Sequence, residues 1–128
     1  MNIAGPHSWR VIHMDRSEHP KDLRPTYLGD SIGKWDGDTL VIDSVGFNEK
    51  IWPFNSYPTT SQLHLMERFS RPTLGSLVYE MTIDDPGAYT APWTGGWYIN
   101  WQPDMELYEY VCQDNNRDVK HMFGGPRN

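Results

Sequence analysis

The stretch from residue 31 to residue 43 constrains the fold more than any other part of the sequence. Two short runs of β-forming residues, 31–35 and 38–43, flank the dipeptide Asp36-Gly37. Asp-Gly between such runs favours a tight hairpin turn, because glycine adopts positive φ angles without steric cost. The pattern therefore predicts two antiparallel strands joined by this turn.

Similar patterns recur along the rest of the chain. The other predicted segments are hairpins from 63–70 to 76–84 and from 96–101 to 105–112, a short strand at 9–14, and one or two helical turns at 114–121. Pro72 and Gly75 support the turn of the second hairpin, because proline pre-sets a turn dihedral and glycine relaxes the exit. About seven strands joined mainly by hairpins are typical of an all-β, antiparallel up-and-down meander.

The predicted architecture is a small lipocalin-like barrel, because closure removes exposed strand edges. A cupin-like roll or a sandwich is the alternative, although the His-x-His pattern of cupins is absent from the sequence. A length of 128 residues suits a single domain covering 1–128. Residues 48–61 combine prolines with bulky apolar side chains, which predicts a packed flap rather than a loose tether.

Composition excludes several classes of function. The net charge is -6, and the 11 Lys and Arg are scattered among 17 Asp and Glu. Phosphate backbones would be repelled, so no nucleic-acid partner is expected. No apolar run approaches the roughly 20 residues that span a bilayer, so no membrane partner is expected either. With Cys112 as the only cysteine, an intramolecular disulfide and a Cys-rich zinc site are excluded.

The first six residues have neither the basic region nor the apolar region of a secretion signal. We therefore expect a cytoplasmic protein if the chain is as written. A periplasmic or secreted protein is the alternative if a signal has been removed.

Three predicted strands each place one carboxylate among apolar neighbours, at Asp43, Glu67 and Glu109. Side chains two positions apart share a face of a strand, so each carboxylate lies on an apolar face. If these faces line the interior, the three groups converge, and burial and mutual repulsion raise carboxyl pKa values. A general acid and a general base can then coexist near neutral pH. In the alternative interpretation they face water or form salt bridges with Arg68, Arg71 or Arg117.

His64 is predicted on the opposite face from Glu67, together with Met66 and Arg68. It is interpreted as a hydrogen-bonded sheet residue or a proton shuttle, and His64 and Arg68 are candidates to assist catalysis. The histidines show no helical metal-binding spacing, so neither a metal nor a cofactor is predicted.

Aromatic residues supply the candidate substrate contacts: Trp52, Trp93, Trp97, Trp101, Tyr108 and Tyr110. Trp97 and Trp101 share parity in the predicted strand and could form a wall that stacks sugar rings or flat aromatic ligands. The alternative is that they fill the core of a small barrel. The two tyrosines are candidates to donate hydrogen bonds to developing negative charge.

Several segments together resemble a large group of uncharacterised bacterial proteins that often carry secretion signals. They are residues 33–43, 46–48, 63–69, 82–86, 91–94 and 109–116. The resemblance covers most of the chain from about His19 onward, and members of the group are commonly longer. It implies that this chain corresponds to their C-terminal half and that a second copy supplies a missing strand in a homodimer. The Gly-x-Trp at 33–35 is also similar to the lipocalin signature, by analogy alone.

These observations favour a small-molecule enzyme in which Asp43, Glu67 and Glu109 perform acid/base chemistry on a sugar-like or aromatic substrate. The reaction would be an elimination, an isomerisation or a hydrolysis. Two alternatives stay open: a non-catalytic barrel that binds carbohydrate or aromatic ligands through its tryptophans, and a metal-dependent cupin-like enzyme with dispersed histidine ligands.

Overall fold

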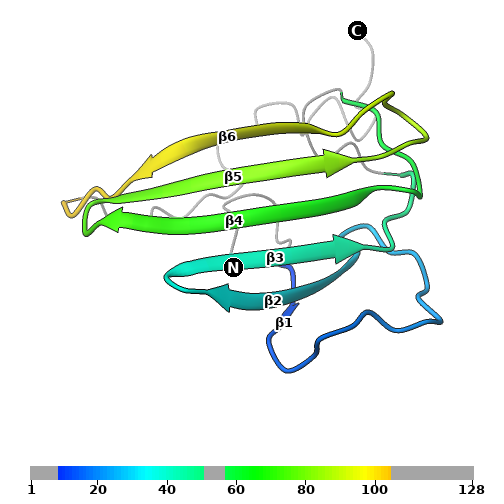
Figure 1. Ribbon diagram of the computed structural model, residues 1–128, viewed down its shortest axis with the longest axis horizontal. Helices are drawn as coiled ribbons and strands as arrows, with labels where there is room; N and C mark the ends of the chain where they lie inside the picture. The colour runs from blue at the N-terminus through cyan, green and yellow to red at the C-terminus, as the bar shows by residue number, and fades with distance from the viewer. Residues whose placement is uncertain (1–8, 51–56, 105–128) are drawn as a thin grey trace, which may run out of the picture.

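The computed structural model describes residues 9–50 and 57–104, which form one six-stranded β-sheet (Figure 1). The strands are β1 (Ile12–His13), β2 (Asp30–Asp36), β3 (Thr39–Val45), β4 (His64–Thr73), β5 (Ser76–Asp84) and β6 (Trp93–Asn100). They lie in the sheet in sequence order; β1 is parallel to β2, and every later neighbouring pair is antiparallel. The described residues contain no helix. The predicted all-β, largely antiparallel meander is confirmed.

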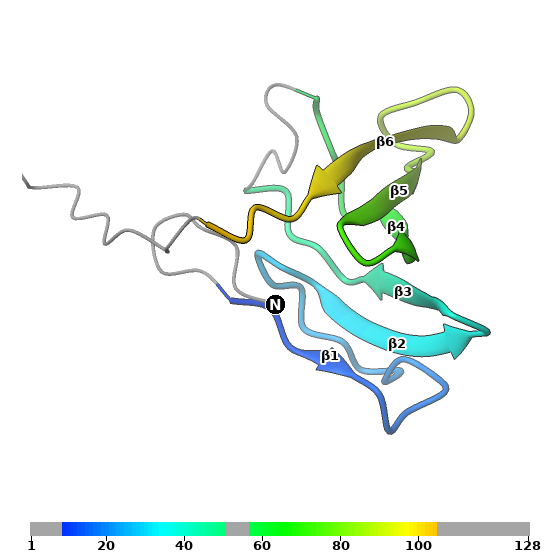
Figure 2. The same cartoon turned by 90° about the vertical axis from the view of Figure 1, so that its left-hand side faces the viewer.

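The sheet does not close into a barrel. Seen from the side, it curves from β1 to β6, and these two edge strands stay apart (Figure 2). No pairing joins β1 to β6 within the part of the chain that the structure describes. Barrel closure is therefore not confirmed.

The first predicted hairpin is present as β2 and β3, with a turn one residue later than predicted. Asp36 is the last residue of β2 and pairs with Thr39, so Gly37 and Asp38 form the two-residue turn. Gly37 has a φ of 59°, the left-handed conformation that hairpin turns of this length require. Glycine therefore occupies the first turn position, and Asp36 extends the strand.

The second predicted hairpin is present as β4 and β5. Its turn is shorter than predicted, because β4 continues to Thr73 after a register irregularity between Ser70 and Thr73. β6 pairs with β5 along its length. The predicted partner of β6 at 105–112, the helical turns at 114–121 and flap residues 51–56 lie outside the described residues.

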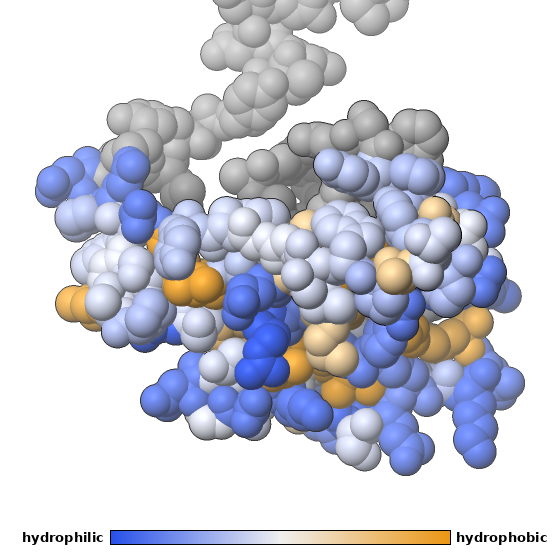
Figure 3. Space-filling view, turned by 45° about the horizontal axis from the view of Figure 1, so that its top comes forward, coloured by the Kyte–Doolittle hydropathy of each residue, from blue (hydrophilic) through white to orange (hydrophobic). Residues whose placement is uncertain are grey.

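The two faces of the sheet differ in character. Residues directly opposite each other in antiparallel strands share a face. One face, which we call the core face, buries Ile42, Leu65, Tyr79, Met81 and Ile83. The other, which we call the polar face, carries Asp43, His64, Met66, Arg68, Glu80 and Thr82. A space-filling view shows polar surface interrupted by separate apolar patches (Figure 3).

Loops complete the core. Gly46 follows β3 with a φ of 73°, which interrupts the alternation of β3 and lets Phe47 join Leu63 in the core cluster. Asp85, only 1% exposed, accepts hydrogen bonds from the Thr60 amide at 2.6 Å and from the Gly87 amide at 3.2 Å. This carboxylate joins the segment before β4 to the turn after β5.

Replacing Gly37 with alanine should lower the free energy of unfolding by about 1 kcal/mol, because a non-glycine residue at positive φ costs about 1–2 kcal/mol. An added Cβ at Gly37 meets nothing within 4 Å, so the cost comes from the backbone alone. Gly75→Ala is the matched control, because its Cβ also meets nothing and its φ is not positive. Urea unfolding of both variants checks this, and equal effects would contradict it.

Candidate functional site

Asp43 and His64 form a hydrogen-bonded pair across β3 and β4 on the polar face. His64 Nε2 lies 2.7 Å from Asp43 Oδ1, and the side chains are 43% and 39% exposed. An ionised carboxylate only accepts hydrogen bonds, so the proton of this bond belongs to Nε2. In the neutral imidazole, Nδ1 is then left with a lone pair that can accept a proton.

A second imidazole approaches the same carboxylate. His19 lies on the segment between β1 and β2, and its Nε2 is 3.4 Å from Asp43 Oδ1. Its other ring nitrogen, Nδ1, is 2.7 Å from Oδ1 of Asp30, the first residue of β2. His19 therefore bridges two carboxylates from adjacent strands.

Arg16 completes the arrangement, with its guanidinium 2.9 Å from Asp30 Oδ2. Desolvation alone would raise the pKa of Asp30, but hydrogen bonds from His19 and Arg16, with the charges of both, lower it below its ordinary range. Asp30 is therefore held ionised. We call the connected set Arg16, His19, Asp30, Asp43 and His64 the polar-face cluster.

Glu67 does not belong to this cluster. Ile42 lies opposite Glu67 and Asp43 lies opposite Met66, so the carboxylates of Asp43 and Glu67 are on opposite faces of the sheet. The prediction that they converge is wrong. The alternation within each strand was correctly predicted, but the register between β3 and β4 reverses the relation between the strands.

Glu67 is instead the centre of a buried ion pair on the core face. Glu67 is 5% exposed. Its Oε2 lies 2.6 Å from the Arg10 guanidinium, and its Oε1 accepts a hydrogen bond from the Tyr79 hydroxyl at 3.0 Å. Burial raises the pKa of Tyr79, and the neighbouring carboxylate raises it further, so the hydroxyl stays a donor. Glu67 therefore forms a salt bridge, as the alternative interpretation of the sequence predicted. Its partner is Arg10 rather than one of the three predicted arginines.

Arg68 shares the polar face with His64 but lies four residues further along β4, roughly 13 Å at the usual rise per residue. Its guanidinium donates to Asp36 at 3.1 Å in an exposed pair. Arg68 is therefore not part of the polar-face cluster. Glu109, Trp52, Tyr108 and Tyr110 lie outside the described residues.

Two of the predicted substrate contacts, Trp93 and Trp97, lie on the opposite face of the sheet from His64. Trp93 and Trp97 lie opposite Ile83 and Tyr79, so both belong to the core face. The Trp93 ring packs against the rings of Tyr57 and Tyr89, with centroids 5.4 and 5.7 Å away. Trp97 packs against the ring of Tyr79 with centroids 4.5 Å apart and is 51% exposed. Trp101, beyond the end of β6, is 60% exposed.

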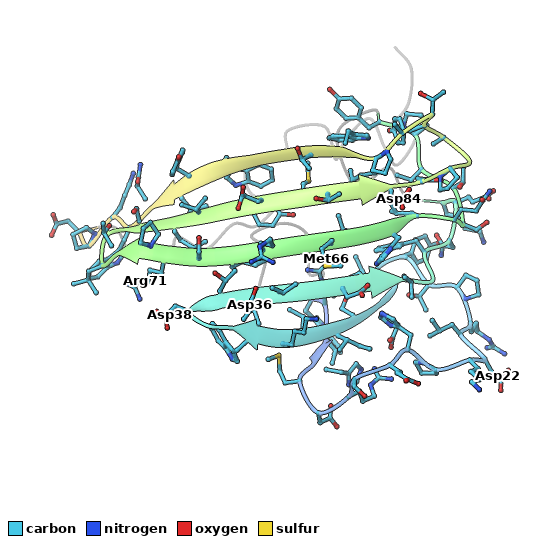
Figure 4. All side chains as sticks on the ribbon, in the orientation of Figure 1. Asp22, Asp36, Asp38, Met66, Arg71 and Asp84 are labelled. Carbon is cyan, nitrogen blue, oxygen red and sulfur yellow. The ribbon has the colours of Figure 1, made fainter. Side chains whose placement is uncertain are left out.

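The core face also carries an open apolar groove of about 430 Å³. Its lining residues are Ile12, Trp35, Asp38, Leu40, Ile42, Phe69, Ser70, Arg71 and Leu77. Figure 4 shows Asp38 and Arg71 at the end of the sheet that holds the β2–β3 turn, and Asp84 at the opposite end. Asp84 pairs with His64, so the groove and the polar-face cluster lie towards different ends as well as on different faces.

Two members of the polar-face cluster, Asp43 and His64, were candidates from sequence, whereas Arg16, His19 and Asp30 were missed. A signal existed for Asp30, because a two-residue turn between Asp36 and Thr39 fixes a register in which Asp30 and Asp43 share a face. His19 lies in a segment without strand periodicity, so only the folded chain brings it to Asp43.

Within residues 9–50 and 57–104, no group of three or more His, Cys, Asp or Glu side chains is arranged to hold a metal ion. The same residues include no helix that is long and apolar enough to cross a membrane. No protein-family model matches the chain, and no curated protein or solved structure is significantly similar to it. The resemblance to secreted bacterial proteins, the homodimer and the small-molecule partner therefore stay predictions.

Replacing Arg10 with methionine should lower the free energy of unfolding by about 3 kcal/mol, because it leaves the buried Glu67 charge unpaired. Arg68→Met is the matched control, since the Arg68–Asp36 pair is exposed and should contribute at most about 1 kcal/mol. Urea unfolding at pH 7 measures both. A loss for the Arg10 variant no larger than that of the control would contradict a buried ion pair.

Asp30→Asn should cost about 1–2 kcal/mol at pH 7, because the carboxylate accepts charge-assisted hydrogen bonds. Since the folded-state pKa of Asp30 is lowered, this stability is fully present above the ordinary carboxyl pKa and is lost as the pH falls through the lower value. The difference from the unmodified protein should thus be constant from about pH 5 to 7 and shrink below about pH 4.

Unfolding free energies measured from pH 7 to pH 2 test this expectation. Asp22→Asn, at an exposed position, is the control and should show no such difference. A cost for Asp30→Asn that is independent of pH would show that the carboxylate charge does not contribute.

Proposed function

We propose that the protein is an acid/base enzyme for small molecules, in which His64 is the general base and Asp43 orients it. The observation that carries this proposal is the 2.7 Å bond between His64 Nε2 and Asp43 Oδ1 beside open solvent. A carboxylate that holds one ring nitrogen fixes the imidazole tautomer and stabilises the imidazolium formed when the other nitrogen takes a proton.

The chemistry follows from the free Nδ1 of His64. It would accept a proton from an acidic C–H bond of a substrate, or from water, and return it later in the reaction as a general acid. Elimination and isomerisation use the first route, and hydrolysis uses the second. A positioned base of this kind contributes about 10²–10⁴-fold to a rate.

The surroundings of the pair favour a polar, sugar-like substrate over an aromatic one. On the polar face, Met66 lies beside Asp43, and Thr82 and Thr94 follow in register on β5 and β6. Threonine hydroxyls can donate to and accept from sugar hydroxyls. The described tryptophan side chains of β6 belong to the opposite face, so a substrate held at His64 would not stack on them.

A panel of neutral oligosaccharides, uronic-acid oligosaccharides and phenyl glycosides, followed by proton NMR in D₂O, tests this function. Proton abstraction would appear as deuterium incorporation or loss of a signal, and hydrolysis as new sugar signals. For a substrate that is turned over, His64→Gln should lower kcat/KM by about 10²–10⁴-fold. Asp43→Asn should also lower it.

Two control variants sharpen the experiment. His13→Gln alters a histidine whose only charged partner among residues 9–50 and 57–104 is the Asp15 carboxylate, at 3.9 Å, and which does not bond to Asp43, so it should leave turnover unchanged. Glu67→Gln, on the other face, should leave kcat unchanged in protein that remains folded. Full turnover by the His64 variant, or no reaction with any member of the panel, would count against the proposal.

A further inference from the structure

A second groove, of about 400 Å³, lies over β4, β5 and β6. This volume is within the range of small-molecule sites in proteins. The residues of the polar face that line it include Arg68, Glu80, Thr82, Thr94, Gly96 and Tyr98. Glu80 lies four residues before Asp84, which is opposite His64, a separation of roughly 13 Å along β5. The groove is therefore separate from the polar-face cluster.

Gly96 leaves a gap in the polar face on β6. It lies opposite Glu80, which in turn lies opposite Arg68. A Cβ at Gly96 would overlap with the carbonyl oxygen of Tyr79, so the close approach of β6 to β5 excludes a side chain there. This row of the sheet therefore ends in bare backbone.

Tyr98 places an aromatic ring beside this gap. It lies two residues after Gly96 on the same face of β6, and it is 75% exposed. Within the part of the chain that the structure describes, its ring is paired with no other aromatic ring. An exposed ring of this kind offers a flat apolar surface together with a polar hydroxyl group at its edge.

Glu80 supplies hydrogen-bond acceptors to the same groove. Its carboxylate forms no hydrogen bond or ion pair with any residue in 9–50 or 57–104. Bonds to an ionised carboxylate are stronger than those between neutral groups. The Arg68 guanidinium adds donors, and the hydroxyl groups of Thr82 and Thr94 both donate and accept. Donors and acceptors thus surround one aromatic surface.

The charges of the groove disfavour ionic ligands. Glu80 would repel an anion, and Arg68 would repel a cation in the same place. Arg68 is already balanced by Asp36, and the net charge of -6 opposes anions at longer range. A neutral sugar suits all of these groups, because it has hydroxyl groups for the polar side chains and a C–H face for the ring.

We propose that this groove binds neutral oligosaccharides. One sugar ring stacks on Tyr98 over the backbone of Gly96, and its hydroxyl groups bond to Glu80 and Thr94. The proposal does not rest on the function proposed for His64, since binding in the groove requires no proton transfer. It also differs from binding through the tryptophans, because Trp93 and Trp97 belong to the core face.

Proton–nitrogen NMR spectra of the full chain, titrated with cellotetraose, xylotetraose or mannotetraose, test the proposal. We expect saturable shifts of the amides of residues 80–82 and 94–98 with at least one of these sugars. The dissociation constant should be about 1 mM, because an open groove contacts only a small part of the sugar. Tetragalacturonate, which is anionic, should bind more weakly.

Two results of this titration would overturn the proposal, and both can be read from the unmodified protein. One is the absence of saturable shifts in the groove with all three neutral sugars. The other is tighter binding of tetragalacturonate than of any neutral sugar.

Variants locate the bound ring. Tyr98→Ala should raise the dissociation constant about 2–10-fold, as expected for the loss of one aromatic contact. Glu80→Gln should raise it about fivefold, because charge-assisted hydrogen bonds become neutral ones. Tyr27→Ala and Glu18→Gln are the matched controls, since they alter exposed side chains of the same types outside the groove. Equal binding by the Tyr98 and Tyr27 variants would overturn the proposal.

His64→Gln separates this site from the proposed enzyme activity. It should bind the neutral sugars as the unmodified protein does, even where it has lost turnover. A loss of binding as large as that of Tyr98→Ala would place the sugar at His64 and overturn the groove. Absence of any turnover by the unmodified protein, with binding retained, would count against the function of His64 alone.

Discussion

The register between β3 and β4 decides which side chains of this sheet can act together. Ile42 lies opposite Glu67, so these two residues share a face and the neighbouring Asp43 points to the other face. His64 points to the same face as Asp43. A shift by one residue would reverse this relation for the whole strand. Burial of Leu65, Ile42 and Ile83 on the core face opposes such a shift, since it would expose these apolar side chains to water.

The carboxylates on the two faces differ in their exposure to solvent. On the core face, Glu67 is buried. Its Oε2 forms an ion pair with Arg10, and its Oε1 accepts a hydrogen bond from Tyr79, so the buried charge is compensated. On the polar face, Asp43 and His64 are more than a third exposed, so a small molecule can reach the imidazole. A carboxylate therefore contributes to stability on one side of the sheet, whereas on the other side a carboxylate lies within reach of small molecules in solution.

Much of the fold was predictable from local patterns. The Asp-Gly dipeptide marked the β2–β3 hairpin, and Gly75 marked the β4–β5 hairpin, because turn chemistry depends on only a few consecutive residues. Pro72, predicted in the second turn, lies within β4 instead. The candidate site was predictable only in part. Asp43 and His64 were identified on separate strands, but the contact between them was not, because the long connection after β3 leaves the register with β4 undetermined.

The sequence by itself determined the class of structure, the two hairpins and the side-chain alternation within each strand, since these follow from backbone geometry over a few residues. Only the tertiary structure decided that Glu67 contacts Arg10 and that Asp43 contacts His64. It also decided that His19, from a segment without strand periodicity, contacts Asp43. These contacts join residues 57, 21 and 24 positions apart, as counted from their numbers. Contacts over such separations depend on strand register and on packing of the whole sheet, which local patterns do not specify.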